Sequence, residues 1–290
     1  MSVEPRVDTP VTATVAEGVA WITLNRPGVL NALDTALAAA LAERVEWAAA
    51  APEVVLVVVR GAGRAFCSGM DRTALARGEI GEPFFRHWIR ALNRLEDMPK
   101  LSLAVLHGHV LGGGLQLATA CDFRLATTDA VLAFGATRHG LVPDGAVLRL
   151  ARLVGLARAK ELALLNDPID AEAARAIGLV HWVCAPEAVA ATVAAVAAKV
   201  RAAAPTATAH TKRLLQRSFH ADPRALVEEL VRVQRVCLES WELAEANRAW
   251  VERREPVYHP RPGRADESPA PPTPDPPGPG AHARPSGDGA

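Results

Sequence analysis

Alternating polar and apolar positions near the start of the chain predict a β-hairpin over Val11–Leu24, with its turn at Glu17 and Gly18. Val54–Val59 is a continuous aliphatic, mostly β-branched run, which is the composition of a strand buried on both faces. Leu101–Leu106 is a second, mainly apolar run and is predicted to be another buried strand. Shorter strands are predicted at 123–126 and 131–134.

The segment from Asn31 to Ala51 is rich in Ala, Leu and Glu, and it is predicted to be a helix that Asn31 caps. Further helices are predicted over 83–97, 113–121, 145–154, 157–164, 171–176 and most of 186–250. Strands that alternate with helices, followed by a helical C-terminal part, predict an α/β fold.

Three regions are predicted along the chain: a core over 1–200, a helical region over 201–258 and a tail over 259–290. From Glu255 onward the chain holds 11 of its 22 prolines, with almost no apolar periodicity. Such a segment buries too little apolar surface to offset the entropy of ordering, so the tail is predicted to be disordered.

The composition narrows the function classes. Among 290 residues, 32 Lys and Arg balance 32 Asp and Glu, which argues against nucleic acid or an anionic membrane held by net charge. No apolar run approaches the roughly 20 residues of a membrane helix, and the N-terminus lacks the apolar segment of a secretory signal. The cysteines lie more than fifty residues apart, which fits no zinc motif or disulfide scaffold and favours reduced thiols in a cytoplasm: Cys67, Cys121, Cys184 and Cys237.

Two familiar site motifs are incomplete. Gly61-Ala-Gly63 follows a strand as a dinucleotide fingerprint does, but the sixth position is Phe66, where close helix packing needs Gly or Ala. His107 and His109 could share a metal ion, but no third ligand has a suitable spacing. No metal site is predicted.

Two glycine-containing segments follow the predicted buried strands. One is Arg64–Asp71, and the other is the triplet Gly112-Gly113-Gly114, at the start of a predicted helix. Glycine lets a ligand approach the backbone closely, and the first N–H groups of a helix have no partner within it. Such groups suit a developing oxyanion. The alternatives are a simple turn at the first segment and tight strand–helix packing at the second.

Taken in order, the motifs of this chain resemble the crotonase (enoyl-CoA hydratase/isomerase) superfamily over about residues 11–260. The segments that carry the resemblance are Ile22–Pro27 with Leu30–Leu33, Arg64–Asp71, His107–Gly114, Ala120–Arg124, Gly140–Asp144 and Ala171–Val180. The resemblance implies a spiral of ββα units followed by helices that assemble a homotrimer or a dimer of trimers. It also implies an acyl-CoA thioester as substrate, with no other cofactor.

The resemblance further implies an oxyanion hole, made here by the backbone N–H groups of Ser68 and Gly113. Fixed amide donors stabilise a thioester enolate without having to reorganise. Arg26, Arg64 and Lys212 are the candidates for contacting the CoA nucleotide.

Hydratases of this family use two glutamates, and both are replaced in this chain. The corresponding positions are Gln116 and Ala136, neither of which exchanges a proton near neutral pH. Simple hydration of an enoyl-CoA is therefore not expected.

One acid remains at a position that the family uses. Asp144 matches the catalytic aspartate of some enoyl-CoA isomerases and the nucleophilic aspartate of 4-chlorobenzoyl-CoA dehalogenases, although it could instead cap the following helix. His87 falls where the dehalogenases carry a histidine if the helix is counted from Pro99, whereas counting from the glycine triplet gives Ile89. Arg138 and His139 lie near Asp144 in sequence. They could tune its pKa or bind a polar substrate.

The sequence thus favours an isomerase-type reaction through a thioester enolate, with Asp144 moving the proton. One alternative is a hydrolase or dehalogenase in which Asp144 is the nucleophile and His87 activates water. Another is a degenerate member that binds acyl-CoA or assembles with partners without turnover.

Overall fold

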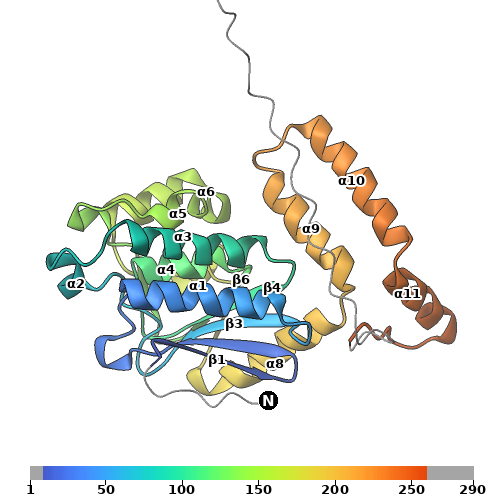
Figure 1. Cartoon of the computed structure of the whole chain (residues 1–290), viewed down its shortest axis with the longest axis horizontal. Coiled ribbons are helices and arrows are strands. Elements are labelled where there is room, and N and C mark those ends of the chain that lie inside the picture. Colours follow the sequence, from blue (N-terminus) through green and yellow to red (C-terminus); the bar gives the residue numbers. More distant parts are fainter. Residues whose placement is uncertain (1–8, 260–290) are drawn as a thin grey trace, which may run out of the picture. The chain divides into compact units, whose positions relative to one another are not determined.

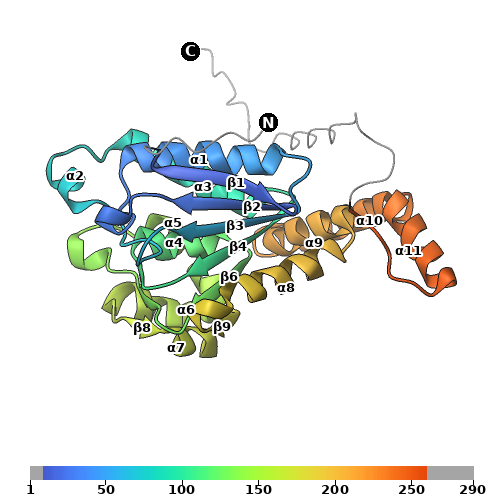
Figure 2. The ribbon, with the colours of Figure 1, turned by 90° about the horizontal axis from the view of Figure 1, so that it is seen from below.

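The computed structural model describes residues 9–259, so the predicted tail over 259–290 lies almost wholly outside the described residues. The main sheet has six strands, five of which run parallel to their neighbours after an initial antiparallel hairpin (Figure 2). In spatial order they are β1 (Val11–Ala16), β2 (Val19–Leu24), β3 (Leu56–Gly61), β4 (Leu101–Leu106), β6 (Phe123–Thr127) and β9 (Trp182–Cys184).

Both faces of this sheet are covered, which explains why its central strands are apolar throughout. In β3, Val57 and Val59 pack into the core formed with α1 (Thr35–Ala50) and α3 (Glu82–Asp97). The alternate residues Leu56 and Val58 pack on the opposite face, against α8 (Val189–Arg201). Figure 1 shows α1 and α3 on one side of the sheet and α8 on the other. The predicted hairpin and both predicted buried strands are confirmed.

A smaller sheet and several short helices stand beside the main sheet. Its strands are β5 (His109–Leu111), β7 (Val131–Ala133) and β8 (Ile169–Asp170). The other elements up to residue 188 are η1 (Pro27–Val29), α2 (Arg72–Ala76), α4 (Gly113–Ala120), η2 (Thr137–His139), α5 (Asp144–Val147), α6 (Leu150–Lys160), η3 (Glu161–Leu165), α7 (Ala171–Ala176) and η4 (Pro186–Ala188). The expected α/β architecture is confirmed, and its strand–strand–helix succession is the one that the resemblance implied.

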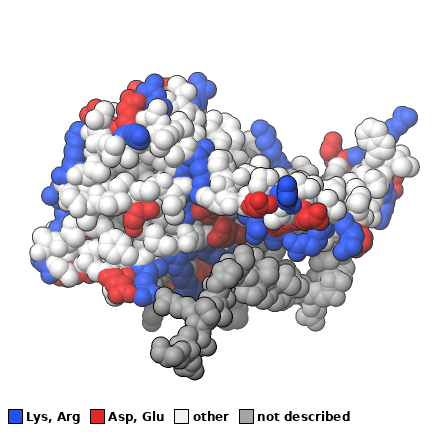
Figure 3. Space-filling view, turned by 90° about the horizontal axis from the view of Figure 1, so that it is seen from above, with Lys and Arg blue, Asp and Glu red and all other residues white. Residues whose placement is uncertain are grey.

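After α8 the described chain is helical, as predicted, through α9 (Pro205–Arg217), α10 (Pro223–Leu238) and α11 (Trp241–Glu252). Within residues 9–259 no single helix meets the length and hydropathy of a membrane span, although the bent pair 186–201 and 205–217 meets them jointly. On the face shown in Figure 3, acidic and basic side chains are interspersed among wide uncharged areas.

The predicted cap of the first long helix is wrong. Asp34 is the N-cap, and its side chain accepts a hydrogen bond from the N–H of Leu37. Asn31 has a left-handed φ of +56° and is fully buried. Its amide donates to the carbonyl oxygens of Ala62 and Ala65, so it fastens the segment after β3 to the segment after β2.

Candidate active site

A cavity of about 1040 Å³ lies where the segment after β3, the start of α4 and the chain from β7 to α5 meet. Its volume is at the upper end of the usual range for a small-molecule site. The polar and charged side chains among its lining residues are Ser68, Arg72, Gln116, Arg138, His139, Asp144 and Asn166. The remaining lining is glycine backbone and apolar side chains, including Phe84 and Trp88 of α3.

Met70 presents a free backbone N–H to this cavity. The N–H of Leu33 donates to the oxygen of Gly69, and the N–H of Asp71 donates to the oxygen of Leu33, each over 2.8 Å. This parallel bridge leaves the N–H of Met70 pointing away from Leu33. Among the described residues it has no hydrogen-bond partner, and Met70 lines the cavity.

Gly113 supplies the second free donor. It is the first residue of α4, and the first bond of that helix runs from the N–H of Gln116 to the oxygen of Gly112. The Gly113 N–H is therefore one of the unpaired groups at a helix start, and it faces the cavity. A Cβ atom at Gly113 would lie 2.4 Å from Cδ1 of Leu33, so a larger residue here would force the Leu33 side chain to move.

The prediction that Ser68 provides an oxyanion donor is wrong. Its N–H donates to the oxygen of Leu30 over 2.9 Å and is not available to a ligand. Gly69, with a φ of +92°, turns the backbone between Ser68 and Met70, so the free donor lies two residues further along. Nothing in the sequence alone shows which of the two N–H groups is paired, because Leu30 approaches from 38 residues away.

Both positions of the missing glutamates face the same cavity. Gln116 is 5% exposed, and its Oε1 accepts a hydrogen bond of 2.8 Å from the N–H of Gly145. Ala136 lines the cavity at the start of η2. The cavity therefore holds a neutral amide and a methyl group at these two positions.

Asp144 is the sole carboxylate among the described residues that line the cavity. Burial raises the pKa of Asp144, while the backbone N–H groups of Gly145 and Asp144 and the charge of Arg149 act in the opposite direction. The alternative that Asp144 caps the helix is wrong, because it is the first residue of α5 and Pro143 is the N-cap. A partly buried carboxyl with a raised pKa suits proton transfer.

The helix α3 settles the uncertain position of His87. Phe84, Phe85 and Trp88 are the residues that α3 contributes to the cavity. His87 is half-buried and is not among the lining residues, nor is the alternative candidate Ile89. The structure therefore gives no support to a catalytic His87.

Two of the three residues predicted to contact the CoA nucleotide, Arg26 and Lys212, instead make ion pairs within the protein. The guanidinium of Arg26 pairs with Asp34 at 3.0 Å and with Asp71 at 3.3 Å. Arg64 is exposed in the turn after β3, and it remains a candidate for contacting the nucleotide.

Lys212 is the clearest correction among these candidates. Its ammonium group donates to Asp122 Oδ2 over 2.8 Å and to the oxygens of Leu95 and Lys100 over 3.0 Å each. The three N–H groups of the lysine are thus all used, and the residue is 7% exposed. Lys212 fastens α9 to the core and is not free to bind a phosphate.

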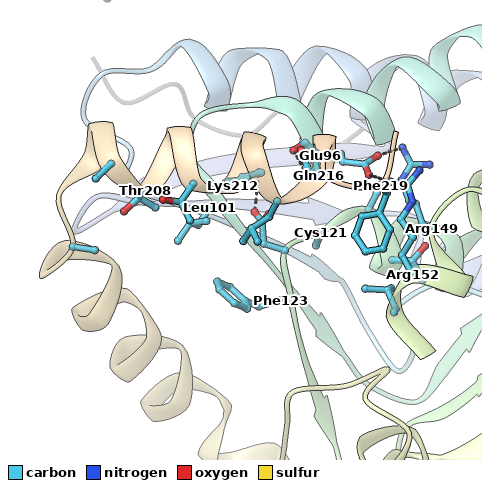
Figure 4. Close-up of a pocket in the computed structure, with 18 of the residues that line it drawn as sticks. Glu96, Leu101, Cys121, Phe123, Arg149, Arg152, Thr208, Lys212, Gln216 and Phe219 are labelled. Atoms are coloured by element: carbon cyan, nitrogen blue, oxygen red, sulfur yellow. Dashed lines mark hydrogen bonds and ion pairs between the residues drawn. The ribbon is translucent and has the colours of Figure 1, made fainter. Parts of the chain in front are cut away.

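A second cavity, of about 680 Å³, lies between α9 and the core around this lysine (Figure 4). Its charged side chains are paired with one another, Lys212 with Asp122 and Arg149 with Glu96. Leu101 and Phe123 add apolar side chains to the lining of this cavity. The charged side chains of its described lining are therefore held in ion pairs, and we take the larger cavity as the candidate active site.

The histidines of the HxH pair do not build a metal site in the described structure. A ring nitrogen of His107 lies 3.1 Å from the oxygen of Gly63, and His109 is exposed on β5. Within residues 9–259 no group of three His, Cys, Asp or Glu side chains is arranged to hold a metal ion.

The enoyl-CoA hydratase/isomerase family model matches residues 14–261 of the chain. A Mycobacterium leprae (strain TN) protein named "Probable enoyl-CoA hydratase echA6" is 32% identical over 253 residues, covering 84% of this chain and 97% of that protein. The (E)-benzylidenesuccinyl-CoA hydratase of Thauera aromatica is 31% identical, covering 86% of this chain and 98% of that protein. The solved structure of an enoyl-CoA hydratase from Mycobacterium smegmatis is similar with a TM-score of 0.80 and 30% identity, covering 88% of this chain and 100% of that one. Because the match extends over nearly all of the described fold, the chain belongs to the enoyl-CoA hydratase/isomerase (crotonase) family.

Proposed function

We propose that the protein is an acyl-CoA isomerase that shifts a double bond through a thioester enolate. The observation that carries the proposal is the cavity's chemistry: one carboxylate, Asp144, and two free backbone donors, from Met70 and Gly113. An enolate needs a base to form it and fixed donors to stabilise it. Coenzyme A carries the substrate, and the proposed reaction needs no other cofactor.

In the proposed reaction, the substrate is a thioester with a double bond between its β and γ carbons. The Asp144 carboxylate takes a proton from the α carbon, and the electron pair moves onto the thioester oxygen as an enolate. The N–H groups of Met70 and Gly113 hold that oxygen. Asp144 then returns the proton to the γ carbon, which leaves the double bond between the α and β carbons and restores the carboxylate.

Hydration is the main competing activity, because the relatives named above are called hydratases. Those names describe those proteins. In this chain Gln116 and Ala136 occupy the two positions where the family's hydratases carry glutamate, and both line the cavity. The hydrolase alternative is weakened for a separate reason, since His87 does not line the cavity and cannot activate water there.

We also propose that the chain assembles as a homotrimer or a dimer of trimers. The outer helices carry large apolar side chains that stay exposed in the single chain, among them Val231 of α10 and Trp250 of α11, which is 84% exposed. Apolar surface of this kind marks interaction sites. Light scattering on the purified full chain tests the assembly, and a monomer would contradict it.

The activity is tested with 3-hexenoyl-CoA in deuterated water. We expect conversion to 2-hexenoyl-CoA, with deuterium in the product only to the extent that the proton on Asp144 exchanges with solvent before it returns, and loss of the conversion in Asp144→Asn. Crotonyl-CoA serves as the hydration substrate, and we expect little or no 3-hydroxybutyryl-CoA. Rapid hydration without isomerisation would overturn the proposal in favour of a hydratase. Binding of both thioesters without any product would support a non-catalytic member.

A further inference from the structure

The lining of the larger cavity carries more positive than negative charge. Arg72, the first residue of α2, and Arg138 of η2 both line the cavity, against the single carboxylate of Asp144. The charge of Arg138 is partly neutralised by Asp167, which lies 3.3 Å away, and its guanidinium also donates to the oxygen of Leu165. Arg72 has no carboxylate partner among the described residues.

The contact that Arg72 does make is with another basic residue. Its Nη1 lies 3.2 Å from the ring nitrogens of His139, which follows Arg138 directly. A ring nitrogen of neutral His139 can accept a hydrogen bond from this guanidinium, and the contact leaves the Nε and Nη2 groups of Arg72 without a partner among the described residues. An arrangement of this kind is favourable when an anion joins it.

The 3-10 helix η2 holds its two basic residues in a defined position. Thr137 donates through its hydroxyl to the oxygen of Ala163, and the amide of Asn166 donates to the Thr137 hydroxyl over 2.6 Å. Asn166 is 3% exposed and also lines the cavity. These bonds hold the backbone of η2 in place, while the side chains of Arg138 and His139 stay exposed to solvent and to a ligand.

The basic residues are close in sequence to the proposed reacting groups. Arg72 follows the oxyanion donor Met70 by two residues, and His139 precedes Asp144 by five. Arg64, the remaining candidate for the CoA nucleotide, does not line this cavity. Apolar side chains such as Leu75, Phe85 and Val142 complete the lining around the basic residues.

We propose that Arg72 and Arg138 bind a carboxylate at the far end of the substrate's acyl group. The preferred substrates are then thioesters of dicarboxylic acids, with an apolar segment between the thioester and the distal anion. Arginine matches a carboxylate with two parallel N–H donors. The inference rests on the proposed binding of acyl-CoA thioesters, but it does not require the isomerase reaction.

The test compares thioesters of equal carbon number that differ in the distal carboxylate. Calorimetry on the full chain measures the affinity of succinyl-CoA against butyryl-CoA, adipoyl-CoA against hexanoyl-CoA, and free CoA. We expect the wild type to prefer at least one dicarboxylic member by about tenfold or more, as a charge-assisted hydrogen bond would give. Arg72→Gln and Arg138→Gln should each reduce that preference without changing the affinity for free CoA.

Arg77→Gln is the matched control, because Arg77 ends the same short helix, is exposed and does not line the cavity. It should keep the preference. If Arg138→Gln does not fold, Arg72→Gln carries the test, since the side chain of Arg72 makes no hydrogen bond to the backbone of another described segment.

Three results would overturn the inference. One is the lack of a preference for either dicarboxylic thioester. A second is an equal loss of affinity for CoA and all its thioesters in the Arg72 and Arg138 variants, which would assign these residues to the CoA phosphates. A third is a preference that survives both substitutions. If no thioester binds to the wild type at all, the proposed function fails together with the inference.

Discussion

The side-chain oxygen of Gln116 accepts a hydrogen bond of 2.8 Å from the backbone N–H of Gly145. The bond connects the first turn of α4, whose first residue Gly113 is a proposed oxyanion donor, to the first turn of α5, which carries Asp144. A neutral amide accepts this bond at every pH, whereas a glutamate would accept it fully only when ionised. Gln116 therefore holds the two halves of the site together without taking part in proton exchange.

Hydratase activity should be gained by Gln116→Glu combined with Ala136→Glu. Both side chains would enter a cavity that already has its oxyanion donors, and each acid or base typically contributes about 10²–10⁴-fold. We expect crotonyl-CoA hydration at least about 10²-fold above the wild type, followed by loss of enoyl absorbance. The neutral control is Ala136→Gln, which should show no gain. A correctly folded double variant that remains inactive would contradict the assignment of these two positions.

Asp144→Asn should abolish isomerisation and leave thioester affinity within a few-fold. Asparagine keeps the shape of the side chain but cannot accept the proton. His87→Asn is the matched control and should keep activity, because His87 does not line the cavity. Kinetics and calorimetry on both variants test this prediction, and full activity in Asp144→Asn would rule out the carboxylate as the proton carrier.

Because the pKa of Asp144 is raised, Asp144→Asn should also change how the stability of the fold depends on pH. Because the pKa is higher in the folded than in the unfolded chain, folding favours the protonated form. The stability that this provides is present below the unfolded pKa and is lost as the pH rises through the folded pKa. Asp144→Asn should therefore not lower the Tm at neutral pH, and it should flatten the decrease of Tm above pH of about 4. A lower Tm at neutral pH would show that the carboxylate stabilises the fold.

Wild-type activity should decrease as the pH falls through the raised pKa of Asp144, because the ionised carboxylate is the base. The acidic limb of the rate profile should lie above the ordinary aspartate pKa of about 3.9. A profile that stays level down to that pH, with folding intact, would contradict a base with a raised pKa.

Replacing the peptide N–H of Met70 by an ester oxygen should lower turnover by about 10²–10³-fold, as the loss of one oxyanion donor does. Such a replacement can be made by incorporating the α-hydroxy acid at this position. The same replacement at Ser68 is the matched control, since its N–H donates to Leu30. It should lower stability while turnover of the folded protein persists. The opposite pattern would restore Ser68 as the donor.

Lys212→Met should destabilise the fold by about 3–5 kcal/mol, because it leaves the largely buried Asp122 without its ion-pair partner. Urea unfolding measures the loss, and calorimetry on the folded variant should give unchanged CoA affinity. Lys199→Met, at an exposed position of α8, is the control and should change stability little. Lower CoA affinity with normal stability would return Lys212 to the nucleotide site.

The sequence by itself determined the elements whose signals are local. A buried strand needs apolar side chains on both faces, so Val54–Val59 predicts β3 to within two residues at either end. The resemblance to the crotonase family also identified Asp144 and the two neutral replacements, Gln116 and Ala136. The structure places all three at one cavity.

Only the tertiary structure decided which groups are available for chemistry. Ser68 and Met70 lie two residues apart, and the contact with Leu30 pairs one N–H while leaving the other free. In the same way Lys212 finds its acceptor Asp122 90 residues away, and no local pattern encodes that approach. Hydrogen-bond partners depend on how distant segments come together. Helix or strand preference and the buried face of an element instead follow from the pattern of neighbouring residues.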